Sequence, residues 1–201
     1  MGRNAKSVRY LLIGVFATMG FSLLISGCAP REPAAETPPH ILAELQESRQ
    51  YYTQVGMWAD RGVRVYGTNY REGGHIPPGT AVEVQSVRGD VIQFTIPERD
   101  GEGFELVNVQ RHTMVDTPTL FERSFAREPV DLDDKPEEIR QAIERGEIIL
   151  GMDRDEVITA RGYPPMHETP TLESDRWRYW INRFATRIVR FQDGEVVEII
   201  E

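Results

Sequence analysis

The alternation of apolar and polar residues changes along the chain and marks out elements of different kinds. Between residues 40 and 59, apolar residues that include Ile41, Leu45, Tyr51 and Val55 recur with the period of an α-helix among polar neighbours. Residues spaced in this way share one face of a helix. The pattern therefore predicts a helix over residues 40–59.

Residues 60–130 change to the short apolar runs that are typical of β-strands. The predicted strands cover residues 63–66, 81–87, 91–96 and 104–107, and Gly- or Pro-rich turns separate them. Four or five short strands at this spacing predict a small β-barrel. The segment IPPGTAVEV (76–84), which a tight hairpin follows, resembles bacterial SH3-like domains. Thr117 or Thr119 is then predicted to cap a short helix.

Residues 131–201 have the pattern of two helices followed by three strands. Capping boxes are predicted at Asp134–Glu137 and at Asp153–Glu156, and Gly146 and Gly162 are predicted to end the two helices. The strands cover residues 176–181, 186–191 and 196–200, and Asp193–Gly194 supplies the last hairpin turn. The fold class is thus α+β: a small β-barrel followed by a helix-helix-three-stranded antiparallel sheet module.

The N-terminus has the pattern of an export signal. Arg3, Lys6 and Arg9 precede an apolar stretch over residues 10–25, and Cys28 is the single cysteine of the chain. The segment Ile25–Cys28 resembles the lipobox of bacterial lipoproteins. This resemblance implies that residues 1–27 are a lipoprotein signal peptide and that Cys28 is lipidated. The alternative is an ordinary secretory signal, or a membrane anchor, with an incidental cysteine.

Composition and charge narrow the class of partner. The formal net charge is -9, and removal of the three basic residues of the signal makes the mature part more acidic still. Nucleic acids are recognised through clusters of Lys and Arg, so we set nucleic-acid binding aside. Residues 28–39 are rich in Pro, Ala and Glu, which predicts an extended tether between the lipid and the folded part.

The C-terminal third carries a second resemblance. The stretches IILGMDRDEVITARGYPP (148–165), WRYW (177–180) and RIVRFQDGEVVEI (187–199) supply Gly151–Met152 before a capped helix, Gly162 and Pro164 after it, and an aromatic strand. These features resemble the SmpA/OmlA family of accessory lipoproteins of the outer-membrane β-barrel assembly machine. The resemblance implies a β-lactamase inhibitor protein-like fold for residues 131–201. It leaves the roughly ninety residues between tether and module unaligned.

Motifs of catalytic and metal chemistry are missing from the sequence. It contains no nucleophile elbow, phosphate loop or dinucleotide fingerprint, and the four histidines are scattered without helical zinc spacing. We therefore expect no enzyme activity, no cofactor and no metal. A cluster of His75 and His112 across the barrel, or a hydrolase site assembled from scattered residues, stays open as an alternative.

The aromatic strand carries the candidate binding residues. Trp177 and Tyr179 share one face, and Arg176, Arg178 and Trp180 share the other. Because Trp and Arg are enriched in protein interfaces, we expect the second face to bind a partner and Trp180 to be more exposed than Trp177.

These features together favour a lipid-anchored, non-catalytic lipoprotein of the bacterial cell envelope. We expect it at the periplasmic face of the outer membrane, because Ala29 follows the cysteine where lipoproteins retained at the inner membrane often carry Asp. Its expected role is that of an accessory or scaffold in envelope assembly, with the barrel-assembly machinery as one partner. The alternatives are a peptidoglycan-binding module and an inhibitor of a periplasmic hydrolase.

Overall fold

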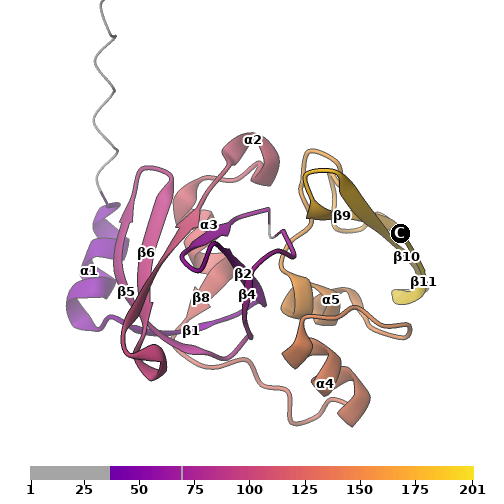
Figure 1. The fold of residues 1–201 in the computed structure, drawn as a ribbon, viewed down its shortest axis with the longest axis horizontal. Helices are drawn as coiled ribbons and strands as arrows, with labels where there is room; N and C mark the ends of the chain where they lie inside the picture. Colours follow the sequence, from indigo (N-terminus) through magenta and orange to yellow (C-terminus); the bar gives the residue numbers. More distant parts are fainter. Residues whose placement is uncertain (1–36, 69) are drawn as a thin grey trace, which may run out of the picture. The chain divides into compact units, whose positions relative to one another are not determined.

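The fold was analysed in a computed structural model that describes residues 37–68 and 70–201. Within this part the chain forms a curled eight-stranded sheet, a separate three-stranded antiparallel sheet and five α-helices (Figure 1). The mixed α+β class predicted from the sequence is confirmed. The predicted signal peptide, Cys28 and most of the tether lie outside the described residues.

The larger sheet, sheet A, uses strands from both ends of the β-rich region. The strands are β1 (Gln50–Thr53), β2 (Met57–Asp60), β3 (Arg64–Tyr66), β4 (Gly74–Ile76), β5 (Ala81–Arg88), β6 (Val91–Ile96), β7 (Glu102–Val107) and β8 (Phe125–Ala126). They lie in the order β4-β2-β3-β7-β6-β5-β1-β8. Neighbours are antiparallel except β3 and β7, which run parallel. The four strands predicted from the sequence are β3, β5, β6 and β7.

The helix predicted over residues 40–59 is wrong beyond its first half. Helix α1 (Pro39–Glu47) buries Ile41 and Leu45 but ends there, and the following residues form β1 and β2. In β1 the buried side chains Tyr51 and Thr53 alternate with Tyr52, which is a strand pattern. Pairing of β1 with both β5 and β8 fixes this segment in the sheet. Tertiary pairing has therefore overridden the local helical spacing.

Two further helices follow β7 in the chain, with the 3-10 turn η1 (Pro97–Arg99) lying between β6 and β7. They are α2 (Gln110–Thr113) and α3 (Thr117–Ser124), and α3 packs against β5 and β6. Asp116 caps α3 by accepting a hydrogen bond from the Thr119 amide at 2.9 Å. The prediction of Thr117 or Thr119 as the cap is therefore off by one or more positions, because Thr117 already lies inside the helix.

The C-terminal module has the predicted element order. Helices α4 (Glu137–Arg145) and α5 (Arg154–Arg161) precede sheet B, which is formed by β9 (Arg176–Asn182), β10 (Ala185–Gln192) and β11 (Glu195–Ile200) in the order β11-β10-β9. Buried side chains of both helices and of all three strands form one apolar cluster, which includes Ile143, Val157, Trp177, Val189 and Val196. Burial of this shared cluster holds the two helices to the sheet.

The ends of the module's elements confirm three of the five signals predicted from the sequence. Asp153 and Glu156 form a reciprocal capping box at α5, and Gly146 ends α4 in the left-handed conformation. Asp193 and Gly194 both have positive φ in the β10–β11 turn, as this type of hairpin requires. The capping box predicted at Asp134 is wrong, because α4 begins one residue after Pro136 and no side chain caps it.

Gly162 follows α5 with a positive φ of 77°, but its ψ of 179° is extended rather than helical. The chain therefore leaves the helix at the predicted residue, although not in the left-handed conformation that the sequence suggested.

Candidate functional site

Strand β9 places the candidate binding residues on the face of sheet B opposite the helices. Trp177 and Tyr179 are completely buried, and the Tyr179 hydroxyl donates a hydrogen bond to the Gly162 carbonyl at 2.9 Å. Arg176 is exposed, and Arg178 and Trp180 are partly exposed. The prediction that Trp180 is more exposed than Trp177 is confirmed.

Trp180 belongs to a group of five rings that the sequence did not reveal. We call Tyr66, Tyr70, His112, His167 and Trp180 the Trp180 cluster. The Tyr70 and Trp180 rings stack with their centroids 5.6 Å apart, and the His112 and His167 rings stack at 4.6 Å. His112 and His167 lie 5.8 and 6.0 Å from Trp180, and Tyr66 lies 6.0 Å from Tyr70. All five rings are near the separations at which aromatic pairs attract each other.

The cluster is assembled from four separate segments of the chain. Tyr66 ends β3 and Tyr70 lies in the loop after it, His112 lies in α2, His167 lies in the loop after α5, and Trp180 lies in β9. Backbone hydrogen bonds hold these four segments together in two pairs. The Arg71 amide donates to the Ile181 carbonyl at 3.1 Å, and the His167 amide donates to the His112 carbonyl at 3.4 Å. The cluster thus joins sheet A to the C-terminal module.

Charged groups border the cluster on the side of β9. Glu168 lies between His167 and Arg178: its Oε1 is 3.5 Å from His167 Nε2, and its Oε2 is 3.4 Å from Arg178 Nε. Burial lowers the pKa of His112, and the neighbouring His167 and Arg111 lower it further. His112 thus lies beside the cation of Arg111, while Glu168 is a carboxylate that acts in the opposite direction on its pKa.

The alternative that pairs His75 with His112 does not match the structure. His112 stacks on His167, whereas the ring of His75 lies 4.5 Å from that of Trp58. Burial, reinforced by Arg161 and other arginines, lowers the pKa of His75 to about 4. In residues 37–68 and 70–201, no three His, Cys, Asp or Glu side chains come together as metal ligands.

Arg161 is a buried arginine at the junction of sheet A and the module. It is 2 % exposed, its guanidinium lies 4.3 Å from the centre of the Trp58 ring, and it donates to the Trp180 carbonyl at 3.4 Å. Beside it, the Gly56 amide donates to the Thr159 carbonyl at 2.8 Å. Burial lowers the pKa of Arg161 to about 10, which leaves it cationic at neutral pH. Arg161 therefore anchors the strand that carries Trp180.

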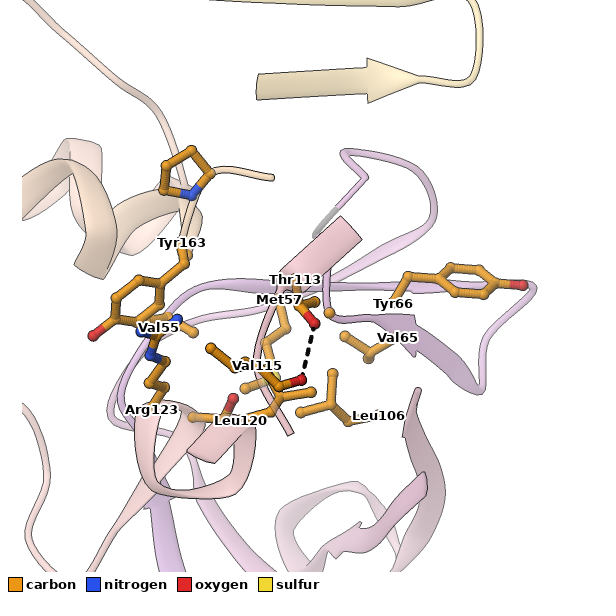
Figure 2. Close-up of a pocket in the computed structure, with 14 residues that line it drawn as sticks. Val55, Met57, Val65, Tyr66, Leu106, Thr113, Val115, Leu120, Arg123 and Tyr163 are labelled. Atoms are coloured by element: carbon orange, nitrogen blue, oxygen red, sulfur yellow. Dashed lines mark hydrogen bonds between the residues drawn. The ribbon is translucent and has the colours of Figure 1, made fainter. Parts of the chain in front are cut away.

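An apolar pocket lies next to the cluster and shares Tyr66 with it (Figure 2). Figure 2 shows Arg123 beside the ring of Tyr163 at one side, and the ring of Tyr66 pointing away at the other. The space open to the centre of a water molecule is about 30 Å³. This volume admits one or two waters but no drug-sized ligand. The Trp180 cluster, rather than this pocket, is therefore the candidate binding surface.

The partners of Trp180 could not be found in the sequence. Trp180 was marked by its aromatic strand, but Tyr70, His112 and His167 lie in separate segments of the sequence, and only the topology brings them to Trp180. The arrangement offers ring faces for stacking and an Arg–Glu pair for polar recognition. Such a combination of aromatic and arginine side chains is typical of protein interfaces.

Comparisons with models of known protein families, with curated proteins and with solved structures find no match to this chain. None of the helices in the described part of the chain is both long enough and apolar enough to span a bilayer.

Proposed function

We propose that this protein is a lipid-anchored, non-catalytic lipoprotein of the bacterial cell envelope that acts as an accessory binding module in outer-membrane or envelope assembly. The lipobox-like segment Ile25–Cys28, which follows a basic and then an apolar stretch, supports the anchor and the compartment. Several acyl chains on one cysteine would hold the protein stably at the membrane, because a single chain binds only marginally.

Family membership and fold relationships are part of the same proposal. The order helix, helix and three antiparallel strands supports an SmpA/OmlA-like module with a β-lactamase inhibitor protein-like fold. The curled sheet A supports an SH3-like interpretation of the middle region, with β1, β2, β4 and β8 added to the four expected strands. On this proposal the chain carries a partner-binding module and a second β domain on one tether.

The Trp180 cluster is the observation that carries the binding role. A folded protein normally covers large rings completely or spreads them singly over the surface. Here Trp180 stays partly exposed beside three other rings and the Arg178–Glu168 pair. Its indole Nε1 is buried and has no hydrogen-bond partner among the described residues. These features support a surface that a partner covers.

The first test separates the anchor from the fold. In Cys28→Ser the protein should lose its membrane attachment and its envelope function, while thermal unfolding of the purified protein stays unchanged, because the two apolar clusters of the structure lie in residues 41–199. Membrane fractionation, mass spectrometry of the mature N-terminus and an envelope-integrity assay measure the three properties. An unmodified Cys28, or full function of a soluble variant, would contradict the proposal.

The second arm of the test asks whether the Trp180 cluster binds the partner. Trp180→Ala should reduce co-purification of envelope proteins after crosslinking about tenfold or more, because hot-spot tryptophans contribute about 2 kcal/mol or more to binding. Leu150→Ala is the control, since Leu150 is 61 % exposed and lies outside the cluster. Loss of binding in both variants, or in neither, would remove the cluster from the proposal.

The same preparation distinguishes the alternative roles. Barrel-assembly components in the crosslinked fraction support the assembly role. Retention on purified peptidoglycan would instead identify a wall-binding module, and a tight complex with a periplasmic hydrolase would identify an inhibitor.

A further inference from the structure

The β9–β10 hairpin concentrates positive charge in an acidic protein. Residues 176–192 contain five arginines and no Lys, Asp or Glu, whereas the whole chain has 23 basic and 32 acidic residues. Phe184, at the hairpin tip, is 85 % exposed, and the guanidinium of Arg183 lies 4.8 Å from the centre of its ring. The hairpin therefore combines an excess of positive charge with an exposed aromatic ring.

Strand register places three of the arginines on one face of the hairpin. Across β9 and β10, Trp180 lies opposite Thr186, Arg178 opposite Ile188, and Arg176 opposite Arg190. Since alternate residues share a face, the side chains of these three pairs project from the face of sheet B opposite the helices. We call these six residues the hairpin face.

The pairing of Arg176 with Arg190 is a local conflict. Like charges directly opposite each other on neighbouring strands destabilise a sheet. The positive charge of Arg190 is balanced by Glu198 at 2.9 Å, and that of Arg178 by Glu168 at 3.4 Å. Arg176 forms no ion pair with any residue in the described part of the chain. A sequence keeps such a conflict most readily where another molecule relieves it.

We propose that the hairpin face binds an acidic polypeptide segment of an envelope partner, with a carboxylate of that segment bound between Arg176 and Arg190. The side chains of residues directly opposite in an antiparallel pair begin about 5 Å apart, so both guanidinium groups can reach one carboxylate. Trp180 and Ile188 supply apolar contact area on the same face. The inference rests on the proposed binding function and names the chemistry of its partner.

Three observations favour an acidic polypeptide over an anionic lipid surface. The hairpin uses arginine alone, whose planar fork matches a carboxylate in two hydrogen bonds. Three of its arginines already hold carboxylates within the chain, those of Glu168, Glu198 and Glu201. A tryptophan and an isoleucine lie between the charges, which is the composition of a protein interface.

Photo-crosslinking from the hairpin tip tests the inference in the full lipidated chain. Phe184 is replaced by p-benzoylphenylalanine, which keeps an aromatic ring at a position too exposed to affect folding. After irradiation of intact cells, the crosslinked peptide is identified by mass spectrometry. We expect a peptide from another envelope protein that carries several Asp or Glu residues.

Charge variants in the crosslinking strain test the electrostatic mechanism. Arg176→Glu with Arg190→Glu should lower the yield about tenfold, because both attractive charges become repulsive. Arg88→Glu is a charge reversal at an exposed position in β5 and should leave the crosslinking yield within about twofold of the wild-type yield. Reversal of the partner's acidic residues to Lys should restore crosslinking to the double Glu variant.

Arg176→Gln separates binding from folding. Because it removes the conflict with Arg190, its unfolding midpoint should equal or exceed that of the wild type while its crosslinking yield falls. A merely structural role for Arg176 would instead lower both.

The remaining outcomes overturn the inference. These are a crosslink to lipid, to a second copy of this chain or to a peptide without acidic residues, and an equal loss of yield in Arg88→Glu. If position 184 gives no crosslink while the anchored protein still co-purifies with a partner, the inference fails and the proposed function stands. If co-purification is also absent, the proposed function fails with it.

Discussion

At the scale of single residues, His75 shows how burial turns a histidine into a pH-sensitive position. Its Nε2 atom is buried and has no hydrogen-bond partner among the described residues. Burial, together with the nearby Arg161, Arg71 and Arg99, lowers its pKa to about 4 from an ordinary value of 6.5. The positive charge of each arginine disfavours protonation of His75. The folded protein therefore keeps this ring neutral over a pH range in which the unfolded chain protonates it.

This difference predicts a loss of stability in mild acid. Between pH 6.5 and pH 4 the unfolded state binds a proton at His75 that the folded state does not, so the free energy of unfolding falls as the pH falls. His75→Phe keeps a ring against Trp58 and should lose less stability than the wild type between these pH values. Because solvent partly screens the charge, we expect the two losses in free energy of unfolding to differ by on the order of 1 kcal/mol. Denaturant titrations at several pH values measure it.

The matched control is His40→Phe, since His40 is an exposed residue of α1. Its stability should follow the wild-type pH curve. A His75→Phe curve that is parallel to that of the wild type would show that His75 does not cause the acid sensitivity.

At the scale of elements, helix α5 begins at a capping box that a lysine reinforces. Asp153 accepts from the Glu156 amide at 2.7 Å, and Glu156 accepts from the Asp153 amide at 2.8 Å. Lys135 lies 2.8 Å from Glu156 and 3.5 Å from Asp153, and its hydrogen bond to Glu156 raises the pKa of the lysine. The ammonium group of Lys135, which lies in the loop before α4, thereby contacts both members of the capping box.

Removal of the cap should destabilise the module measurably. Asp153→Ala leaves the Glu156 amide without its partner and should lower the free energy of unfolding by about 1 kcal/mol. Asp155→Ala removes the same charge from the first turn, but Asp155 is exposed and is not the N-cap. Chemical denaturation should show a clearly smaller loss for Asp155→Ala. Equal losses would mean that helix-dipole charge, rather than the cap hydrogen bond, stabilises α5.

At the scale of the molecule, sheet A and the module meet at glycines where a larger residue would have to displace its neighbours. A Cβ atom at Gly146 would lie 2.4 Å from the Trp58 ring and 2.8 Å from Nε2 of His75. A Cβ atom at Gly56 would lie 2.4 Å from the Ala160 carbonyl oxygen. The two parts of the described chain therefore pack at backbone distance, with Arg161 buried beside the contact.

Gly146→Ala tests this packing against a control that shares its backbone conformation. Gly146 and Gly151 both have positive φ, but a Cβ atom at Gly151 meets no atom within 4 Å. Gly151→Ala should therefore cost about 1 kcal/mol from backbone strain alone. Gly146→Ala should cost about 1–3 kcal/mol more, because Trp58 must move. Thermal unfolding measures both, and equal losses would contradict a tight junction.

The sequence by itself determined the features that depend on neighbouring residues. The capping box at Asp153, the helix end at Gly146 and the Asp193–Gly194 hairpin each satisfy local backbone geometry, so a few residues suffice to predict them. The alternation along β9 likewise separated the face of Trp177, which is buried, from the face of Trp180, because alternate residues of a strand share a face.

Only the tertiary structure decided what depends on contacts between distant segments. Residues 50–60 form strands because β1 pairs with β5 and β8 and β2 pairs with β3 and β4. The helical spacing of these residues carries no information about such distant partners. The Trp180 cluster and the facing pair Arg176 and Arg190 likewise arise from topology and register. Pairing and packing energies between segments far apart in sequence leave no local pattern, and for this reason the ring partners of Trp180 became visible only in the folded chain.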